Sequence, residues 1–249
     1  MTKKCVITGA TSGIGLEIAK ELLVSKEWSI ISISRNKDKI REAKKILGSE
    51  MIDFYEGDIS DSKQVDTFAE YVSQKFGNID ALVNNAGVIY PGGVESLALE
   101  EWAATMNINL TSVFYMTQKL LDNLKKSKRA SVVNISSISS KLMGSSVAYS
   151  VCKAGVDMLT KCMAKEMASY GIRVNSVNPG ITKTGFQISN NILVADKYDD
   201  FLQEIEKDYP LGVGEVEDVS KLVVFLLSDN AKWMTGSNVI IDGGRSVSI

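Results

Sequence analysis

A tyrosine and a lysine stand four residues apart in the stretch AYSVCKAG, which covers residues 148–155. Four residues are close to one turn of an α-helix, so Tyr149 and Lys153 would lie side by side on one helix face. A free tyrosine titrates near pH 10, too high for an efficient base at neutral pH. A neighbouring ammonium group favours the phenolate and would lower the pKa of the tyrosine. The pair therefore predicts a proton-transfer site, although its spacing alone is equally typical of two side chains on a helix surface.

The absence of histidine from the 249-residue chain narrows the chemistry. It excludes Ser-His-Asp and Cys-His catalysis and removes the commonest metal ligand, so we expect no metal site. An acid–base step near neutral pH must use a carboxylate, a lysine, a cysteine or a tyrosine. The three cysteines, Cys5, Cys152 and Cys162, lack metal-binding spacing and suit a reducing cytosol, so we expect a cytoplasmic protein.

Charge and hydropathy indicate neither a nucleic-acid partner nor a membrane. The formal net charge is −2, which leaves no excess of basic residues for binding phosphates or anionic lipids. The apolar run LVVFLL at 222–227 is far too short to span a bilayer. The first residues, MTKKCVITGATSG, contain too few apolar positions for a signal peptide.

Apolar, β-rich runs alternate along the chain with longer amphipathic stretches. This alternation is typical of right-handed βαβ units, in which helices cover both faces of a parallel sheet. Only three prolines occur, and there is no linker-like or low-complexity stretch. We predict one domain, residues 1–249, with a doubly wound α/β fold. The expected strands are 3–8, 28–34, 51–57, 80–85, 130–136, 172–178 and 237–242, and the expected helices are 14–26, 37–47, 61–76, 100–126, 148–170 and 215–228.

A glycine-rich turn follows the first expected strand and leads into a helix. The stretch TGATSGIG at 8–15 places glycines at Gly9, Gly13 and Gly15. Such glycines let the backbone turn tightly and approach a pyrophosphate, which the positive N-terminus of the helix attracts. The spacing is G-x-x-x-G-x-G rather than G-x-G-x-x-G, so a turn without a ligand is the alternative. The position after the first strand favours a dinucleotide site.

The end of the second expected strand indicates which dinucleotide is bound. Sheets that bind NAD usually carry an acidic residue there to hold the ribose 2′-hydroxyl. This chain has Ser34 and Arg35 instead, followed by Lys37. A carboxylate would repel a 2′-phosphate, whereas a hydroxyl and a guanidinium group would bind it. The sequence therefore favours NADP(H), with an exposed arginine at a strand end as the alternative.

Seven short motifs now stand in order along the chain. They are TGATSGIG, NNAG at 84–87, INL at 108–110, ISS at 135–137, YSVCK at 149–153, NPGITKT at 178–184 and MTGSNVIIDGG at 234–244. With these motifs the chain resembles the short-chain dehydrogenase/reductase family over essentially its whole length. The resemblance implies a Rossmann-like, seven-stranded sheet in the order 3-2-1-4-5-6-7. It also implies hydride transfer between a nicotinamide cofactor and a ketone or secondary alcohol.

The resemblance also implies roles for individual residues. Tyr149 would be the general acid/base, and Lys153 would hold the nicotinamide ribose and lower the pKa of the tyrosine. Ser137 would hydrogen-bond the substrate oxygen, and Asn109 would anchor a proton-relay water beside Lys153. Asp58 and Ile59 would flank the adenine, Asn85 would lie along the adenosine ribose, and Thr182 and Thr184 would reach the carboxamide. The full implied cofactor-binding set, for NADP(H), is Gly9, Ser12, Gly13, Ile14, Gly15, Ser34, Arg35, Asp58, Ile59, Asn85, Ala86, Gly87, Tyr149, Lys153, Pro179, Gly180, Thr182 and Thr184.

Two features depart from the family pattern. Ser137 lies 12 residues before Tyr149, whereas many members have one more residue in this loop. Ser136 would restore the longer spacing, but the second serine of ISS is the usual catalytic one, so we choose Ser137. Cys152 stands where many members carry a smaller residue. We expect it to pack as a small apolar side chain, with redox control as the alternative.

The segment 185–209, between Thr184 and Pro210, is longer than a simple connection requires. We predict that it forms a lid over the substrate. Residues 197–209 have helical spacing and more acidic side chains than lysines, so this segment would repel an acidic acyl carrier protein. The basic run LKKSKR at 124–129 could dock such a partner, or it is a solvated helix end. The apolar underside would comprise Phe186, Ile188, Ile192, Leu193 and Val194, with Phe201, Leu202 and Ile205 on the helical part.

We therefore expect an NADP(H)-dependent oxidoreductase for a free, moderately apolar ketone or hydroxy compound. The alternative is a 3-oxoacyl-[acyl-carrier-protein] reductase of fatty acid synthesis. A catalytically silent, cofactor-sensing regulator is a remote third reading, which the intact Ser, Tyr, Lys and Asn set disfavours. Tetrameric relatives imply a homotetramer or homodimer through helices 100–126 and 148–170, although core packing explains their apolar stripes equally well. Those stripes are Val113, Met116 and Leu120 on the first helix, and Met158, Cys162 and Met163 on the second.

Overall fold

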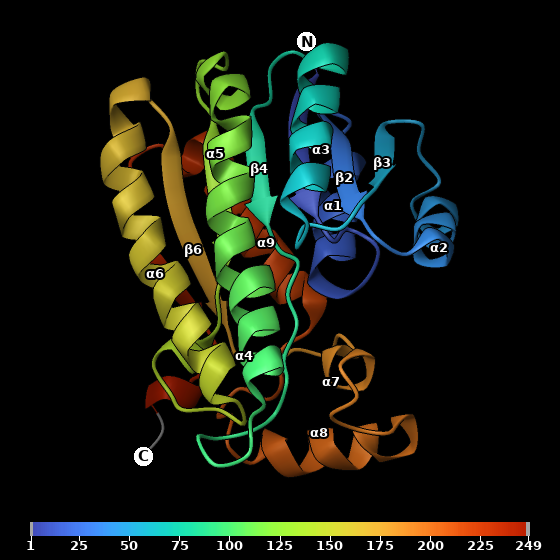
Figure 1. Ribbon diagram of the computed structural model, residues 1–249, viewed down its shortest axis with the longest axis vertical. Helices are drawn as coiled ribbons and strands as arrows, with labels where there is room; N and C mark the ends of the chain where they lie inside the picture. The colour runs from blue at the N-terminus through green and yellow to red at the C-terminus, as the bar shows by residue number, and fades with distance from the viewer. Residues whose placement is uncertain (1, 248–249) are drawn as a thin grey trace.

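The computed structural model describes residues 2–247, in which seven strands form one sheet. The strand order is β3-β2-β1-β4-β5-β6-β7 and every neighbouring pair is parallel, which confirms the expected Rossmann-like topology (Figure 1). The strands are β1 (Lys3–Thr8), β2 (Trp28–Ser34), β3 (Ile52–Glu56), β4 (Ala81–Asn84), β5 (Ser131–Ile135), β6 (Arg173–Pro179) and β7 (Asn238–Ile241).

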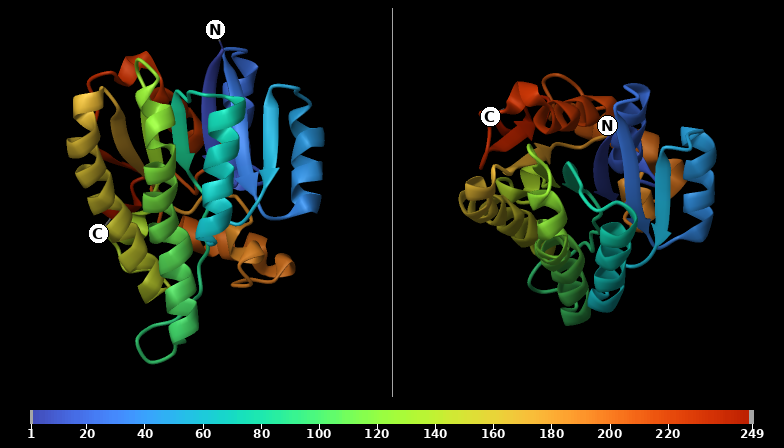
Figure 2. Two further views of the ribbon diagram at one scale, coloured as in Figure 1. Left: turned by 45° about the horizontal axis from the view of Figure 1, so that its top comes forward. Right: turned by 90° about the horizontal axis from the view of Figure 1, so that it is seen from above.

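Helices cover both faces of this sheet, as the continuous apolar strands require (Figure 2). On one face, α1 and α9 bury residues such as Ile18, Leu22 and Val223 against the strands. On the other, α3, α5 and α6 contribute residues such as Phe68 and Leu120. The helices are α1 (Gly13–Val24), α2 (Lys37–Leu47), α3 (Ser62–Lys75), α4 (Leu99–Met106), α5 (Ser112–Lys125), α6 (Val147–Met167), α7 (Phe186–Ser189), α8 (Tyr198–Glu206) and α9 (Val216–Leu227).

Local sequence signals account for several helix boundaries. Asn36, Asp61 and Ser146 each accept a hydrogen bond from a backbone N–H of the helix that they precede. These side chains satisfy donors that have no partner within the first turn. Gly48 ends α2 with a left-handed backbone, a conformation that glycine adopts without steric cost.

The helical stretch expected over 100–126 is confirmed, but a π-helical turn divides it into two helices. A π-helical turn at Asn107–Thr111 separates α4 from α5, and the N–H of Ser112 donates to the carbonyl of Asn107. One additional residue is accommodated in this turn, and such turns occur frequently at functional sites. The apolar periodicity continues through the turn, which is why the sequence pattern alone indicates one helix.

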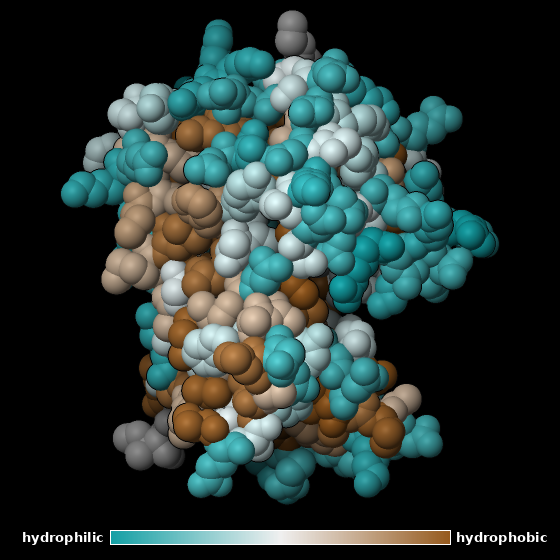
Figure 3. All heavy atoms as spheres, viewed as in Figure 1, coloured by the Kyte–Doolittle hydropathy of each residue, from teal (hydrophilic) through white to brown (hydrophobic). Residues whose placement is uncertain are grey.

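The residues expected to form oligomer faces are mostly in the core. Val113, Met116 and Leu120 are buried under α5, and Met163 is buried under α6. Helix geometry puts these stripes against the sheet, as core packing predicts. Two members of the expected set, Met158 (59%) and Cys162, are exposed, as is Phe114 (46%) on α5, and Figure 3 shows apolar side chains on this face.

The loops that follow the carboxyl ends of the strands gather at one edge of the sheet. The segment with α7 and α8 lies across this edge, at the bottom of Figure 1. Figure 3 shows the surface hollowed between this segment and the body of the molecule. Within residues 2–247, no helix is long and apolar enough to cross a membrane.

Candidate active site

A cavity of about 710 Å³ opens at the carboxyl ends of the strands, where α/β sheets bind ligands. Its walls come from almost the whole chain, from Gly9 to Arg245. All but two of the residues implied by the family resemblance line it, the two being Gly15 and Asn109. The lining members are Gly9, Ser12, Gly13, Ile14, Ser34, Arg35, Asp58, Ile59, Asn85, Ala86, Gly87, Ser137, Tyr149, Lys153, Pro179, Gly180, Thr182 and Thr184.

The glycine-rich loop fits the cavity wall so closely that side chains there would collide. Gly13 has φ +53°, a backbone conformation that favours glycine. A Cβ on Gly15 would lie 2.4 Å from Asn85 Nδ2 and 2.5 Å from the Gly9 carbonyl oxygen. Asn85 Nδ2 donates to the carbonyls of Thr8, at 2.9 Å, and Gly9, at 3.2 Å, which fixes the loop. This backbone cradle at the start of α1 fits a pyrophosphate.

The end of β2 carries no carboxylate. Ser34 is buried, and the Arg35 guanidinium lies 3.7 Å from Asp58 Oδ2 with 64% of the arginine side chain exposed. Lys39 lines the cavity beside Arg35, whereas Lys37 lies 3.4 Å from Glu56 and is not part of the wall. Lys39 is not among the residues expected from the sequence, although its place in the first turn of α2 is a usable signal.

Lys153 is buried against the strand ends. Its Nζ donates to the carbonyl of Ile135 at 2.7 Å and lies 5.3 Å from the centroid of the Tyr149 ring. Burial lowers the pKa of Lys153 to about 8, and the opposing influences are Cys152 and Asp157. The two side chains are adjacent, as their helical spacing predicts.

The expected lowering of the Tyr149 pKa is wrong for the protein without cofactor. Burial raises the pKa of Tyr149 to about 12, and a hydrogen bond with the Ser137 side chain only partly opposes this. Removing water from a phenolate disfavours it, and the hydrogen bond from Lys153 goes to a backbone carbonyl. Tyr149 is therefore held as the neutral phenol, a proton donor.

The structure distinguishes the two serines before Tyr149. Ser137 lines the cavity, hydrogen-bonds with Tyr149 and accepts from the N–H of Ser139 at 3.1 Å. Ser136 is buried, and its Oγ donates to the backbone carbonyl of Lys153 at 3.1 Å. Ser137 is thus the serine whose hydroxyl reaches the tyrosine.

Asn109 lies in the π-helical turn behind the cavity wall. It is fully buried, its Oδ1 accepts from the N–H of Val88 at 3.1 Å, and its Nδ2 donates to the carbonyls of Val88 and Thr105, each at 2.9 Å. A Cβ on Gly87 would lie 2.7 Å from Asn109 Oδ1 and 4.0 Å from Lys153 Nζ. The asparagine side chain therefore fixes the loop after β4 next to Lys153.

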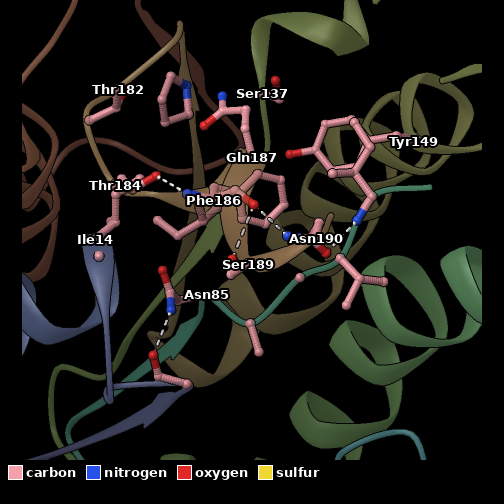
Figure 4. A pocket seen from close by; sticks show the side chains of 18 of the residues that line it. Ile14, Asn85, Ser137, Tyr149, Thr182, Thr184, Phe186, Gln187, Ser189 and Asn190 are labelled. Carbon is pink, nitrogen blue, oxygen red and sulfur yellow. Dashed lines mark hydrogen bonds between the residues drawn. The ribbon is translucent and has the colours of Figure 1, made fainter. Parts of the chain in front are cut away.

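The loop after β6 closes the cavity opposite the tyrosine (Figure 4). Thr182 Oγ1 donates to the carbonyl of Gly180 at 3.2 Å, and Thr184 Oγ1 accepts from the N–H of Phe186 at 3.1 Å. A Cβ on Gly13 would lie 3.2 Å from Thr184 Cβ, so the glycine-rich loop and this loop touch.

The lid segment, residues 185–209, supplies part of its expected apolar side. Phe186, Ile192, Leu193, Phe201 and Ile205 line the cavity, and the Phe186 ring lies 6.3 Å from that of Tyr149. Ile188 and Leu202 are not part of the wall, and Val194 is 63% exposed. The expectation that these three side chains form the apolar underside of the lid is therefore wrong. A short, irregular segment gives no period from which the inward side chains could be predicted.

Two polar residues of the lid segment, Gln187 and Asn190, line the cavity but are not among the residues expected from the sequence. Asn190 Oδ1 accepts from the N–H of Ile89 at 3.1 Å and joins the segment to the loop after β4. Gln187 lines the cavity, and its buried Oε1 has no hydrogen-bond partner among residues 2–247. Figure 4 shows Gln187 in the region bounded by Thr184, Ser137 and Tyr149. Unpaired buried oxygens are costly, which makes Gln187 a candidate polar contact for a bound molecule.

Cys152 packs as the sequence suggests. It is buried, its Sγ lies 3.2 Å from Met106 Sδ, and burial raises the pKa of its thiol to about 11. A neutral, shielded thiol is a poor nucleophile.

The sequence of the chain is similar to those of known proteins over nearly its whole length. A family model described as enoyl-(acyl carrier protein) reductase matches residues 9–246. The chain belongs to the short-chain dehydrogenase/reductase family. It is 37% identical to the 3-oxoacyl-[acyl-carrier-protein] reductase FabG of Thermotoga maritima over 97% of either chain. It is 33% identical to the 2,3-dihydro-2,3-dihydroxybenzoate dehydrogenase of Bacillus subtilis, over 99% of this chain and 97% of that one.

A solved structure has the same fold as this chain. The aldohexose dehydrogenase of Thermoplasma acidophilum superposes with a TM-score of 0.89 and 28% identity, covering 100% of this chain and 95% of that one. The chain is therefore an oxidoreductase that acts on CH–OH groups of a small molecule with a nicotinamide cofactor.

Proposed function

We propose that the protein is an NADP(H)-dependent reductase of small, free ketones, working in reverse as a secondary-alcohol dehydrogenase. One observation carries this proposal. A single cavity brings Ser137, Tyr149 and Lys153 together with a glycine cradle and the Arg35 guanidinium. The first three are the side chains that a carbonyl reduction needs, and the others suit a phosphorylated dinucleotide.

The cofactor would extend along the cavity from Arg35 to Thr184. The backbone of Gly9 and Gly13 and the start of α1 would hold its pyrophosphate. Ser34, Arg35 and Lys39 would bind the 2′-phosphate of NADP(H), and the absence of a carboxylate at the end of β2 supports this choice. Exposed ion pairs are weak, so Arg35 can leave Asp58 at little cost.

The remaining cofactor contacts follow from the positions of the lining residues. Asp58 and Ile59 would flank the adenine, Asn85 the adenosine ribose, and Lys153 the nicotinamide ribose. Thr182 and Thr184 would reach the carboxamide. The other proposed contacts are the backbone and side chains of Ser12, Ile14, Ala86, Gly87, Pro179 and Gly180.

Proton transfer would be the task of Tyr149. The cofactor, when bound, supplies or accepts the hydride. Tyr149 would donate its phenolic proton to the carbonyl oxygen as the alcohol forms, and Ser137 would hydrogen-bond the same oxygen. The raised pKa keeps the phenol protonated, as a donor must be, and in the alcohol-oxidising direction the positive charges of Lys153 and the oxidised nicotinamide would favour the phenolate. Asn109 would support a proton-relay water by fixing the loop beside Lys153.

The cavity supports a free substrate rather than a carrier-bound one. The lid segment combines apolar lining residues with the unpaired Gln187 amide, which suits a ketone bearing a hydroxyl or a similar polar group. The outer side of the lid is acidic along α8 and would repel an acidic carrier protein. The second candidate is a 3-oxoacyl-[acyl-carrier-protein] reductase, which the similarity to FabG proteins favours.

The variant Tyr149→Phe tests the proposed chemistry. NADPH oxidation is followed at 340 nm with a panel of aryl ketones, cyclic ketones, hydroxyketones and acetoacetyl thioesters. Removing only the proton donor should lower kcat by ~10²–10⁴-fold and leave NADPH binding within about twofold of the wild-type value. NADPH affinity comes from fluorescence titration.

The structure offers Tyr170→Phe as the matched control, because this tyrosine is exposed and outside the cavity wall. It should retain full activity. If Tyr149→Phe kept more than a tenth of the wild-type kcat, the assignment of Tyr149 would be wrong. If no ketone or thioester consumed NADPH while the cofactor still bound, the silent sensor would be the better description.

A further inference from the structure

A buried carboxylate lies one helical turn beyond Lys153 and belongs to none of the roles above. Asp157 is only 4% exposed, on the face of α6 that carries Lys153. A buried carboxylate is costly unless charges and hydrogen-bond donors surround it. The contacts of Asp157 therefore indicate what holds this charge in place.

The neighbours of Asp157 come from the loop that carries Ser137 and from β6. Asn178 Nδ2 lies 2.9 Å from Oδ1 and 3.0 Å from Oδ2 of Asp157. The same amide donates to the backbone carbonyl of Ser137 at 3.2 Å and to Ser140 Oγ at 3.0 Å. Lys141 Nζ lies 3.1 Å from Asp157 Oδ2, with 46% of the lysine side chain exposed. Asp157 thus joins α6 to both ends of the stretch 137–141.

The carboxylate of Asp157 also influences the protonation of Lys153. The ionisable groups that act on Lys153 are Cys152, Tyr149 and Asp157, all on α6. The thiol of Cys152 and the phenol of Tyr149 are neutral at physiological pH because burial raises the pKa of each, whereas hydrogen bonds keep the pKa of Asp157 low. The contacts from β5 and the loop after β4 are uncharged groups, such as the carbonyl of Ile135. Asp157 is thus the charged group among these, buried one helical turn from Lys153 on the same face of α6.

We propose that Asp157 is a positioning residue of the reaction: it anchors the Ser137 loop through Asn178 and Lys141, and its carboxylate keeps the buried Lys153 charged. This inference rests on the proposed function for its catalytic meaning. Asp157 is not part of the cavity wall, so it would act only through these partners. Lys141 moderates the effect, because its positive charge partly neutralises this carboxylate.

Substitutions of Asp157 and of Lys141 should shift the titration of Lys153 in opposite directions. Asp157→Asn removes the anion and retains the shape, so Lys153 should lose its proton at lower pH, by about half a unit or more. Lys141→Gln leaves the carboxylate without its counter-charge, so Lys153 should lose its proton at higher pH. A role confined to packing would move neither titration in this pattern.

Lysine labelled with ¹³C at the ε-carbon gives the readout without any catalysis. The resonance of Lys153 is assigned with Lys153→Arg and followed from pH 6 to 10 in the wild type and both variants. Lys119→Gln, which removes a lysine that pairs with Asp66 on another face, is the matched control and should leave Lys153 unchanged. Thermal unfolding of each variant confirms that it is folded.

Ketone reduction by the same variants then tests the positioning. In Asp157→Asn the decline of kcat towards alkaline pH should begin at lower pH, with KM for NADPH changed less than kcat. Unmoved titrations, or shifts of one sign in both variants, would overturn the inference. If the titrations move as expected and no ketone is reduced by any form, the proposed function fails and the electrostatic role stands.

Discussion

At the scale of single residues, burial determines the protonation of the two ionisable side chains of the site, Tyr149 and Lys153. Tyr149 is kept protonated by burial, and Lys153 is kept near its titration point by the same burial. The ammonium is directed at a strand carbonyl, so its influence on the phenol depends on distance rather than on a direct hydrogen bond. Binding of a positively charged nicotinamide would change the balance in favour of the phenolate.

Arg35 provides the prediction on cofactor choice. A charge-assisted hydrogen bond to phosphate contributes about 1.5–3 kcal/mol, which corresponds to about 10- to 150-fold in affinity. Ser34→Asp combined with Arg35→Ala should therefore shift preference from NADPH towards NADH by at least tenfold in kcat/KM. Arg41→Ala, on the exposed side of α2, is the control and should change neither value. Equal use of NADH and NADPH by the wild type would contradict the assignment.

Residue identity predicted much of this site, and geometry explains the remainder. Gly9, Tyr149 and Lys153 could be placed because their motifs require a particular backbone or spacing. Gln187 could not be placed, because nothing in its sequence neighbourhood fixes which way a four-residue helix faces. The pKa of Tyr149 was also beyond the sequence, since the depth of burial exceeds the influence of the lysine.

At the scale of elements, the lid segment forms part of the wall of the cavity that contains Tyr149, where it would control the access of substrates. Its contacts with the rest of the described chain include Asn190, which binds the loop after β4, and Tyr209, whose hydroxyl accepts from the N–H of Ile181 at 2.9 Å. Asp208 also pairs with Arg245 at 3.4 Å. Its inner side is largely apolar, and α8 presents Asp199, Asp200 and Glu204 outwards. On the proposed function, such an arrangement would admit a small ketone more readily than an acidic protein.

The lid therefore yields a prediction on substrate. The kcat/KM for a small cyclic or aryl ketone should exceed that for acetoacetyl-carrier protein at low ionic strength. Reversing the three charges, in Asp199→Lys, Asp200→Lys and Glu204→Lys together, should raise kcat/KM for the carrier substrate severalfold and leave the small ketone unchanged. Asp122→Lys, an exposed position on α5, is the control. A hundredfold preference of the wild type for the carrier substrate would establish the acyl-carrier reductase instead.

The strands and long helices were predicted to within three residues at each end, except for the π-helical turn. Runs rich in apolar residues on both faces, such as SVVNI of β5, require cover on both faces, which indicates a parallel sheet without knowledge of the contacts. The turn at Asn107–Thr111 breaks no apolar pattern, so only the backbone reveals it. Its effect is to bring Asn109 against the loop that lies beside Lys153.

At the scale of the whole molecule, apolar surface remains on the outer side of α5 and α6. Phe114, Val151 and Met158 are each more than 40% exposed, which is unusual for neighbouring helices of a monomer. We expect a homotetramer or homodimer. Light scattering at micromolar concentration should give a multiple of the monomer mass, and Phe114→Glu with Met158→Glu should lower it. Val24→Glu, at an exposed position on α1, is the control, and a monomeric mass for the wild type would refute the expectation.

The contact between the glycine-rich loop and Thr184 has a consequence for how the protein is made. Gly9 and Gly13 leave the ribosome early, whereas Thr184 and Arg245 follow only when most of the chain exists. A growing chain can carry the tyrosine and lysine and still lack one wall of the cavity. A cofactor that needs both walls would bind only a nearly finished molecule, to which it would add about 2.7 kcal/mol of stability at a hundred times its dissociation constant. In the cell, the supply of cofactor would thus favour completed copies over partial ones.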